Sequence, residues 1–93
     1  MATYDSAEIR RAAHVVRSSR DRLNASVLSG LRSVEGELDG EFKGQAAEAL
    51  EKRLGNLTSD ARRIEDKLDV LYRTLMKFAQ DLDDTDREIA SKL

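Results

Sequence analysis

The sequence predicts an all-α protein, namely an antiparallel two-helix hairpin that dimerises into a four-helix bundle. Three observations predict this fold. Apolar residues recur at alternating steps of three and four through the second half of the chain, none of the 93 residues is proline, and charged residues make up 37% whereas aromatic residues make up 4%. Such a stripe lies on one side of an α-helix and must be covered by another helix. The absence of proline favours long helices, and the high charge suits a solvated surface.

The first helix is expected over about residues 6–39. Asp5 is a suitable N-cap, Glu8 completes a capping box, and Tyr4 and Ile9 form a hydrophobic staple. Arg20 takes a charged position in the apolar stripe, where its long stem can still cover apolar surface. The stripe of this helix consists of Ile9, Ala13, Val16, Leu23, Val27, Gly30, Val34 and Leu38.

The chain reverses at about residues 40–44, where Gly40 and Gly44 give the strongest turn signal. A second helix is expected over about residues 45–90, antiparallel to the first because the connection is short. We predict no break at Gly55, since the stripe stays in phase across it. The stripe consists of Ala47, Leu50, Leu54, Leu57, Ala61, Ile64, Leu68, Leu71, Leu75, Phe78 and Leu82. Leu68 and Leu71 are expected deep in this stripe.

The two helices are expected to differ in length. Counting equal distances from the turn, residues from about 80 to 93 have no partner in their own hairpin. We therefore expect this tail to project past the body and to be frayed or flexible.

Small residues recur every seven positions along the first helix, beside apolar ones. This pattern fits either a solvated serine face or a flat dimer surface that lets another backbone approach closely. The dimer-face residues predicted on the second interpretation are Ala12, Val16, Ser19, Leu23, Ser26, Gly30 and Ser33.

No pattern in the sequence indicates catalysis. His14 is the only histidine and has no metal ligands at suitable spacing, and there is no phosphate-binding loop and no nucleophile with a base. We expect no enzyme, no cofactor and no metal. The net charge of −2 and the scattered arginines argue against nucleic acid, and no apolar run predicts stable membrane insertion or a signal peptide.

The turn resembles that of the WXG family of small type VII (ESX) secretion substrates, the early-secretory-antigen-like proteins. Phe42-Lys43-Gly44 stands where the family has Trp-x-Gly, and the following Gln45-Ala46-Ala47-Glu48-Ala49-Leu50 is similarly rich in small residues. Phenylalanine keeps the aromatic bulk but lacks the indole N–H donor. The tail resembles the family's C-terminal export pattern at Leu82, Asp86, Ile89 and Leu93.

Residues 1–93 are expected to form a single helical hairpin domain. The resemblance implies a small secreted factor, or the targeting partner of a larger effector, exported as a folded helical dimer. The implied partners are a second copy, a related hairpin or an effector N-terminal domain, together with an export ATPase that reads the tail. The implied location is outside the cell without a cleavable signal peptide, and the cytoplasm before export. The alternative is a cytosolic helical adaptor or chaperone that masks an amphipathic helix of a partner.

Overall fold

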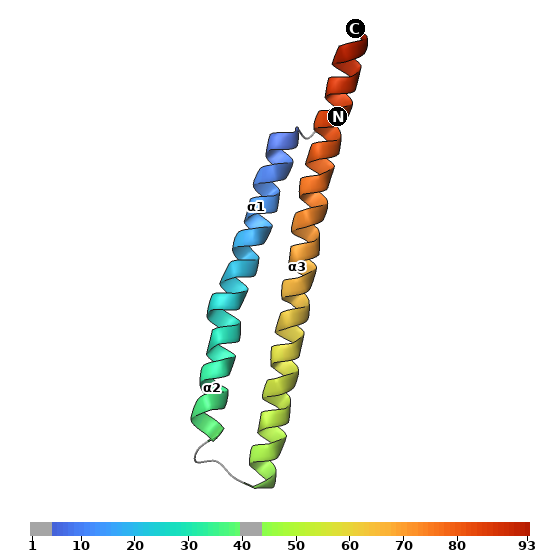
Figure 1. The fold of residues 1–93 in the computed structure, drawn as a ribbon. Helices are drawn as coiled ribbons and strands as arrows, with labels where there is room; N and C mark the ends of the chain where they lie inside the picture. Colours follow the sequence, from blue (N-terminus) through green and yellow to red (C-terminus); the bar gives the residue numbers. More distant parts are fainter. Residues whose placement is uncertain (1–4, 40–43) are drawn as a thin grey trace. The chain divides into compact units, whose positions relative to one another are not determined.

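A computed structural model describes residues 5–39 and 44–93, and nearly all of these residues are helical. The first arm consists of α1 (Ser6–Arg22), the π-helix η1 (Leu23–Leu28) and α2 (Ser29–Asp39), which follow one another without a gap. The second arm is the single helix α3 (Gln45–Lys92). The predicted all-α hairpin is therefore confirmed (Figure 1), whereas its dimerisation stays a prediction.

The first arm begins as its sequence predicts. The backbone N–H of Glu8 donates to Oδ1 of Asp5 at 2.8 Å, and the N–H of Ile9 donates to the carbonyl oxygen of Asp5 at 3.2 Å. Asp5 thus satisfies an N–H group that has no partner within the helix. Tyr4 lies outside the described residues, so the hydrophobic staple stays a prediction.

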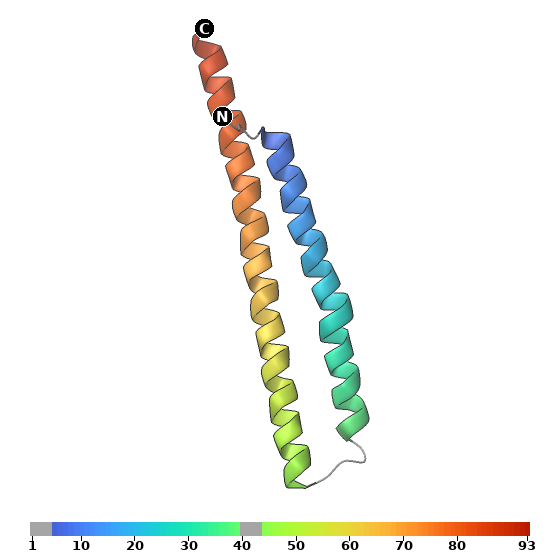
Figure 2. The ribbon, with the colours of Figure 1, turned by 180° about the vertical axis from the view of Figure 1, so that it is seen from behind.

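The chain divides into two compact units. The first unit combines Met1–Ser19 with Leu68–Leu93. Within it, early residues of α1 face late residues of α3, so the two segments run antiparallel (Figures 1 and 2): Arg10 pairs with Asp83 at 2.8 Å, and Arg17 donates to Tyr72 at 3.2 Å. Its buried apolar residues are Ile9, Ala13 and Ala79.

The second unit is formed by Arg20–Lys67. Its buried apolar residues are Leu28 on the first arm and Ala47, Leu54 and Ala61 on α3. A half-buried polar group lies beside this core, because Glu65 accepts hydrogen bonds from Arg20 at 3.1 Å and from Asn24 at 3.0 Å. Arg20 thus takes its predicted position in the stripe and also has a charged partner.

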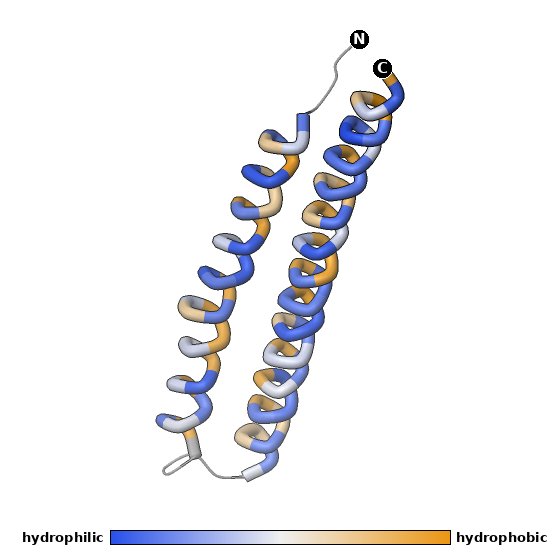
Figure 3. Tube along the Cα trace, turned by 45° about the horizontal axis from the view of Figure 1, so that its top comes forward, coloured by the Kyte–Doolittle hydropathy of each residue, from blue (hydrophilic) through white to orange (hydrophobic). Residues whose placement is uncertain are grey.

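The first arm covers the apolar stripe of α3 only in part. The stripe separates into two rows, and within each row the residues recur every seven positions. Figure 3 shows hydrophobic segments that repeat along α3. Leu68 and Leu71 were both expected deep in the stripe, but within one chain Leu71 is 44% exposed, whereas Leu68 is half-buried. The inner row, buried or half-buried, is Ala47, Leu54, Ala61, Leu68, Leu75 and Leu82, and the outer row, exposed, is Leu50, Leu57, Ile64, Leu71 and Phe78. One neighbouring helix covers a limited arc of α3, so only one row is covered.

The first arm also departs from its predicted stripe. Val27, Gly30 and Val34 are exposed, whereas Leu28 is buried and Leu31 is half-buried. The cause is the π-helix Leu23–Leu28, which takes more residues per turn than an α-helix and shifts the inward-facing positions by one residue. The simple periodicity that predicted Val27 assumes a regular α-helix throughout.

The start of α3 requires a special backbone conformation at Gly44, whose φ is +107°. This is the positive φ that the sequence predicted for a turn glycine, and side chains other than hydrogen rarely adopt it. Phe42 and Lys43 of the turn motif, together with Gly40, lie outside the described residues. The second helix then continues unbroken through Gly55, as predicted, and ends at Lys92.

Candidate functional site

The outer row of α3 is the main candidate for partner binding. In the second unit it contributes Leu50, Leu57 and Ile64, and in the first unit Leu71 and Phe78, all exposed. Residues seven apart lie on one side of a helix, and a row of large apolar side chains with this spacing is suited to packing against another helix. Sequence reasoning placed these residues in a single apolar stripe that another helix must cover. Their seven-residue spacing, considered separately from that of the inner row, indicates that two neighbouring helices are needed to cover both rows of α3.

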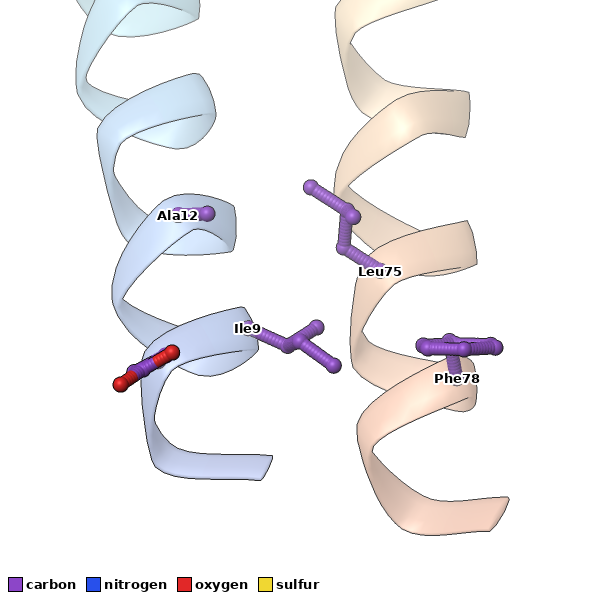
Figure 4. Close-up of a pocket in the computed structure, with 5 residues that line it drawn as sticks. Ile9, Ala12, Leu75 and Phe78 are labelled. Carbon is purple, nitrogen blue, oxygen red and sulfur yellow. The ribbon is translucent and has the colours of Figure 1, made fainter. Parts of the chain in front are cut away.

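A groove in the first unit adjoins this row. It has a volume of about 390 Å³ and lies between α1 and α3, where it is lined by Glu8, Ile9, Ala12, Leu75 and Phe78. Ile9 and Leu75 point toward the opposite helix, whereas the ring of Phe78 lies over its own helix, α3 (Figure 4). Ala12 has only a methyl group, which leaves room for a side chain of a neighbouring helix. Of these five lining residues, Glu8 alone is charged.

The groove brings together residues that the sequence placed in different roles. Ala12 was predicted for the dimer face and Phe78 for the apolar stripe of the second helix, and both line the same groove. Of the other predicted dimer-face residues, Ser26, Gly30 and Ser33 are exposed, whereas Val16, Ser19 and Leu23 are half-buried and offer only part of their surface. Sequence reasoning did not single out Val15, which is exposed.

An aromatic and basic cluster lies elsewhere in the first unit. The guanidinium carbon of Arg17 lies 5.0 Å from the centre of the Tyr72 ring, and the His14 ring centre lies 6.2 Å from it at an angle of 54°. A cation over an aromatic face is attracted by the ring quadrupole. Tyr72 is half-buried and His14 is exposed, which agrees with a packing role for the tyrosine and a surface position for the histidine.

The C-terminal tail is helical to Lys92, and α3 continues past the start of α1 (Figure 1). The expectation that it lacks a partner from residue 80 onward is wrong at its beginning, since Leu82 is half-buried and Asp83 pairs with Arg10. Ser6, the first residue of α1, also donates to Asp83, so Asp83 lies level with the start of α1. From residue 84 onward all side chains are exposed, including Asp86, Ile89 and Leu93 of the predicted export signal.

The carboxyl group of Asp83 has a pKa below its ordinary value of 3.8. A hydrogen bond from Ser6 is the largest cause, followed by the hydrogen bond from Arg10. Both donors stabilise the charged carboxylate. The start of α1 is thereby joined to α3 just before the exposed tail begins.

Within residues 5–39 and 44–93, no group of three or more histidine, cysteine, aspartate or glutamate side chains is arranged to hold a metal ion. None of the helices described is long and apolar enough to cross a membrane.

Comparison with known families gives one match. The family model WXG100, described as proteins of 100 residues with WXG, matches residues 2–87. No curated protein and no solved structure matched the chain.

Proposed function

Because the chain belongs to the WXG100 family, whose members are small helical proteins associated with type VII secretion, we propose that it is a secreted factor or targeting partner exported as a folded helical dimer. The observation that carries this proposal is the outer row, an exposed line of large apolar side chains along α3. Large exposed apolar surfaces on a small protein mark sites of interaction.

The outer row and the groove form the proposed dimer face. Leu71 and Phe78 are about half exposed, so complete burial of either side chain contributes roughly 1 kcal/mol to association. A neighbouring helix packs along the row, and one of its side chains fills the groove beside Ala12. The partner is a second copy, a related hairpin or the N-terminal domain of an effector.

Solution mass tests the dimer face. Leu71→Ser and Phe78→Ser should each reduce the measured mass to that of a monomer, while circular dichroism shows unchanged helix content. Val70→Ser is the matched control, because Val70 is 52% exposed and lies next to Leu71 but outside the outer row. A parent chain that is monomeric, alone and with candidate partners, would contradict the proposal.

The exposed end of α3 is the proposed export signal. Leu82, Asp86, Ile89 and Leu93 lie at offsets of four, seven and eleven, which places them along one helical face. The last three are exposed, so the export ATPase can reach them without unfolding the hairpin. Apolar residues anchor such a helix in a groove, and Asp86 fixes its orientation.

Export and melting temperature, measured on the same variants, test the signal. Asp86→Ala and Ile89→Ser should abolish export from cells that carry the secretion system and leave the melting temperature nearly unchanged. Asp84→Ala removes the same charge two residues earlier and should be exported normally. Normal export of the Asp86 variant would exclude the signal.

The adaptor hypothesis predicts a different outcome. A cytosolic adaptor or chaperone would use the same outer row to mask a partner helix but would not need the tail. A chain that ends at Asp83 keeps the pair with Arg10. If this shortened chain still binds its partner and the full-length chain is never exported, the adaptor function is favoured.

A further inference from the structure

The π-helix in the first arm has an unusual hydrogen-bonding pattern with consequences for packing. It spans Leu23–Leu28, and the N–H of Ser29 donates to the carbonyl oxygen of Asn24, five residues earlier. An α-helix closes each turn with a four-residue step, so the π-helix holds extra chain in one turn. All residues that follow are rotated about the helix axis, relative to a regular α-helix, by about the angle that separates two consecutive residues.

Two sets of apolar residues, each with one member at the end of the π-helix and one in α2, compete for the inward position. The first set, Leu28 and Leu31, is inward in the structure, with Leu28 only 1% exposed. The second set, Val27 and Val34, is exposed. The second set continues the steps of three and four that lead from Val16 through Leu23, so a regular α-helix would turn the valines toward α3 instead.

Interactions within the second unit favour the observed arrangement, in which Leu28 and Leu31 face inward. Both carboxylate oxygens of Glu65 are used, since Oε1 accepts from Arg20 in α1 and Oε2 accepts from Asn24 inside the π-helix. The Glu65 side chain is only 15% exposed, so its hydrogen bonds are partly shielded from water. Leucine side chains also fill more space than valine side chains, and Gly30, between the two valines, has none.

We propose that the π-helix is a register switch, which sets the apolar residues of the first arm that face α3. Glu65 holds the arm in the observed register, with Leu28 and Leu31 inward. In the second register, residues 23–28 form a regular α-helix and the extra residue is accommodated after Val34. Val27 and Val34 then face α3, and Leu28 and Leu31 face outward. The arm thereby presents one of two apolar surfaces to a partner, which goes beyond the proposed dimer and export functions.

Thiol labelling can report the register directly, because the chain has no cysteine of its own. Single cysteines are introduced as Val27→Cys, Leu28→Cys and Leu54→Cys, and their rates of reaction with a maleimide are compared. In the parent background, Val27→Cys should react much faster than Leu28→Cys, because buried thiols react slowly. Adding Glu65→Ala should accelerate Leu28→Cys and slow Val27→Cys, lowering the ratio of their rates at least about fivefold.

The direction of the changes separates a register shift from loosening of the hairpin. Leu54→Cys lies on α3 in the same unit, at a buried position that the shift does not move. If Glu65→Ala accelerates all three cysteines together, or changes none, the proposal is overturned. Asp66→Ala is the matched control for loss of an acidic side chain, since Asp66 is exposed, and it should leave the ratio unchanged.

A deletion variant gives a second test that does not depend on the stability of Glu65→Ala. Deleting the exposed Ser26 removes the extra residue, so that a regular α-helix keeps Leu28 inward. In this background, Glu65→Gln should no longer alter the ratio of the labelling rates. In the chain that keeps Ser26, Glu65→Gln should lower that ratio. An equal effect of Glu65→Gln in both backgrounds would overturn the switch.

Discussion

Replacing Leu28 by alanine should destabilise the hairpin more than any neighbouring change in the first arm. The side chain is 1% exposed, the lowest fraction among the large side chains of the described residues. The change removes three carbon atoms, which corresponds to about 2.4 kcal/mol at roughly 0.8 kcal/mol for each buried group. The cavity left behind adds to this cost, so the free energy of unfolding should fall by about 3 kcal/mol. A domain of 93 residues has a total stability of about 5–14 kcal/mol.

The assay is urea unfolding followed by helical circular dichroism, at several protein concentrations. Val27→Ala is the control, because Val27 is the adjacent residue and is 45% exposed. Its cost should be below about 1 kcal/mol. Any additional cost that appears only at high protein concentration reports association, because a dimer is stabilised by mass action.

The outcome that would refute this reasoning is a reversed order of the two variants. If Val27→Ala costs more than Leu28→Ala in dilute solution, then the valine faces α3 and the π-helix does not set the resting register. Equal small costs would mean that neither residue belongs to a packed core.

Further predictions concern the turn and the acid dependence of stability. Gly44→Ala should lower the melting temperature because Gly44 has a φ of +107° with open space where a side chain would lie, so that the cost is backbone strain alone. Gly55→Ala, at a helical position with equally open space, should instead stabilise the protein by about 1 kcal/mol, and an equal loss in both variants would contradict the backbone explanation. The lowered pKa of Asp83 contributes stability that is fully present above its unfolded value near 3.8 and is lost as the pH falls through the lower folded value. Asp83→Asn should therefore lose less stability than the parent over this acidic range in pH-dependent melting, and an unchanged profile would show that the Ser6 and Arg10 contacts do not persist in solution.

Much of the fold could be predicted from residues that act locally. Asp5 and Glu8 mark the start of the first arm because an exposed helix end needs a nearby acceptor. Gly44 marks the start of α3 because positive φ favours glycine. The continuity of α3 through Gly55 also followed from the sequence, since the apolar period was unbroken there.

The candidate site could be predicted only in part. The tail was predicted from its length and spacing, and its exposure from residue 84 onward agrees with that prediction. Its beginning was misplaced because Asp83 still contacts Ser6 and Arg10 of α1, and a count of residues from the turn does not fix which residues of the two arms face each other. Which residues form the outer row could not be predicted, because periodicity shows that a stripe is apolar but not how many neighbouring helices cover it.

The sequence by itself determined that the chain is helical, where its arms begin, and that α3 is amphipathic, because caps, glycines and periodicity act through bonds and neighbours a few residues apart. Tertiary structure alone decided which half of each stripe is buried. The choice between Leu28 and Val27, and between the inner row and Leu71, depends on the packing of one arm against the other within each unit. Contacts between residues such as Asn24 and Glu65, which are 41 positions apart, set that packing, and local periodicity carries no record of them.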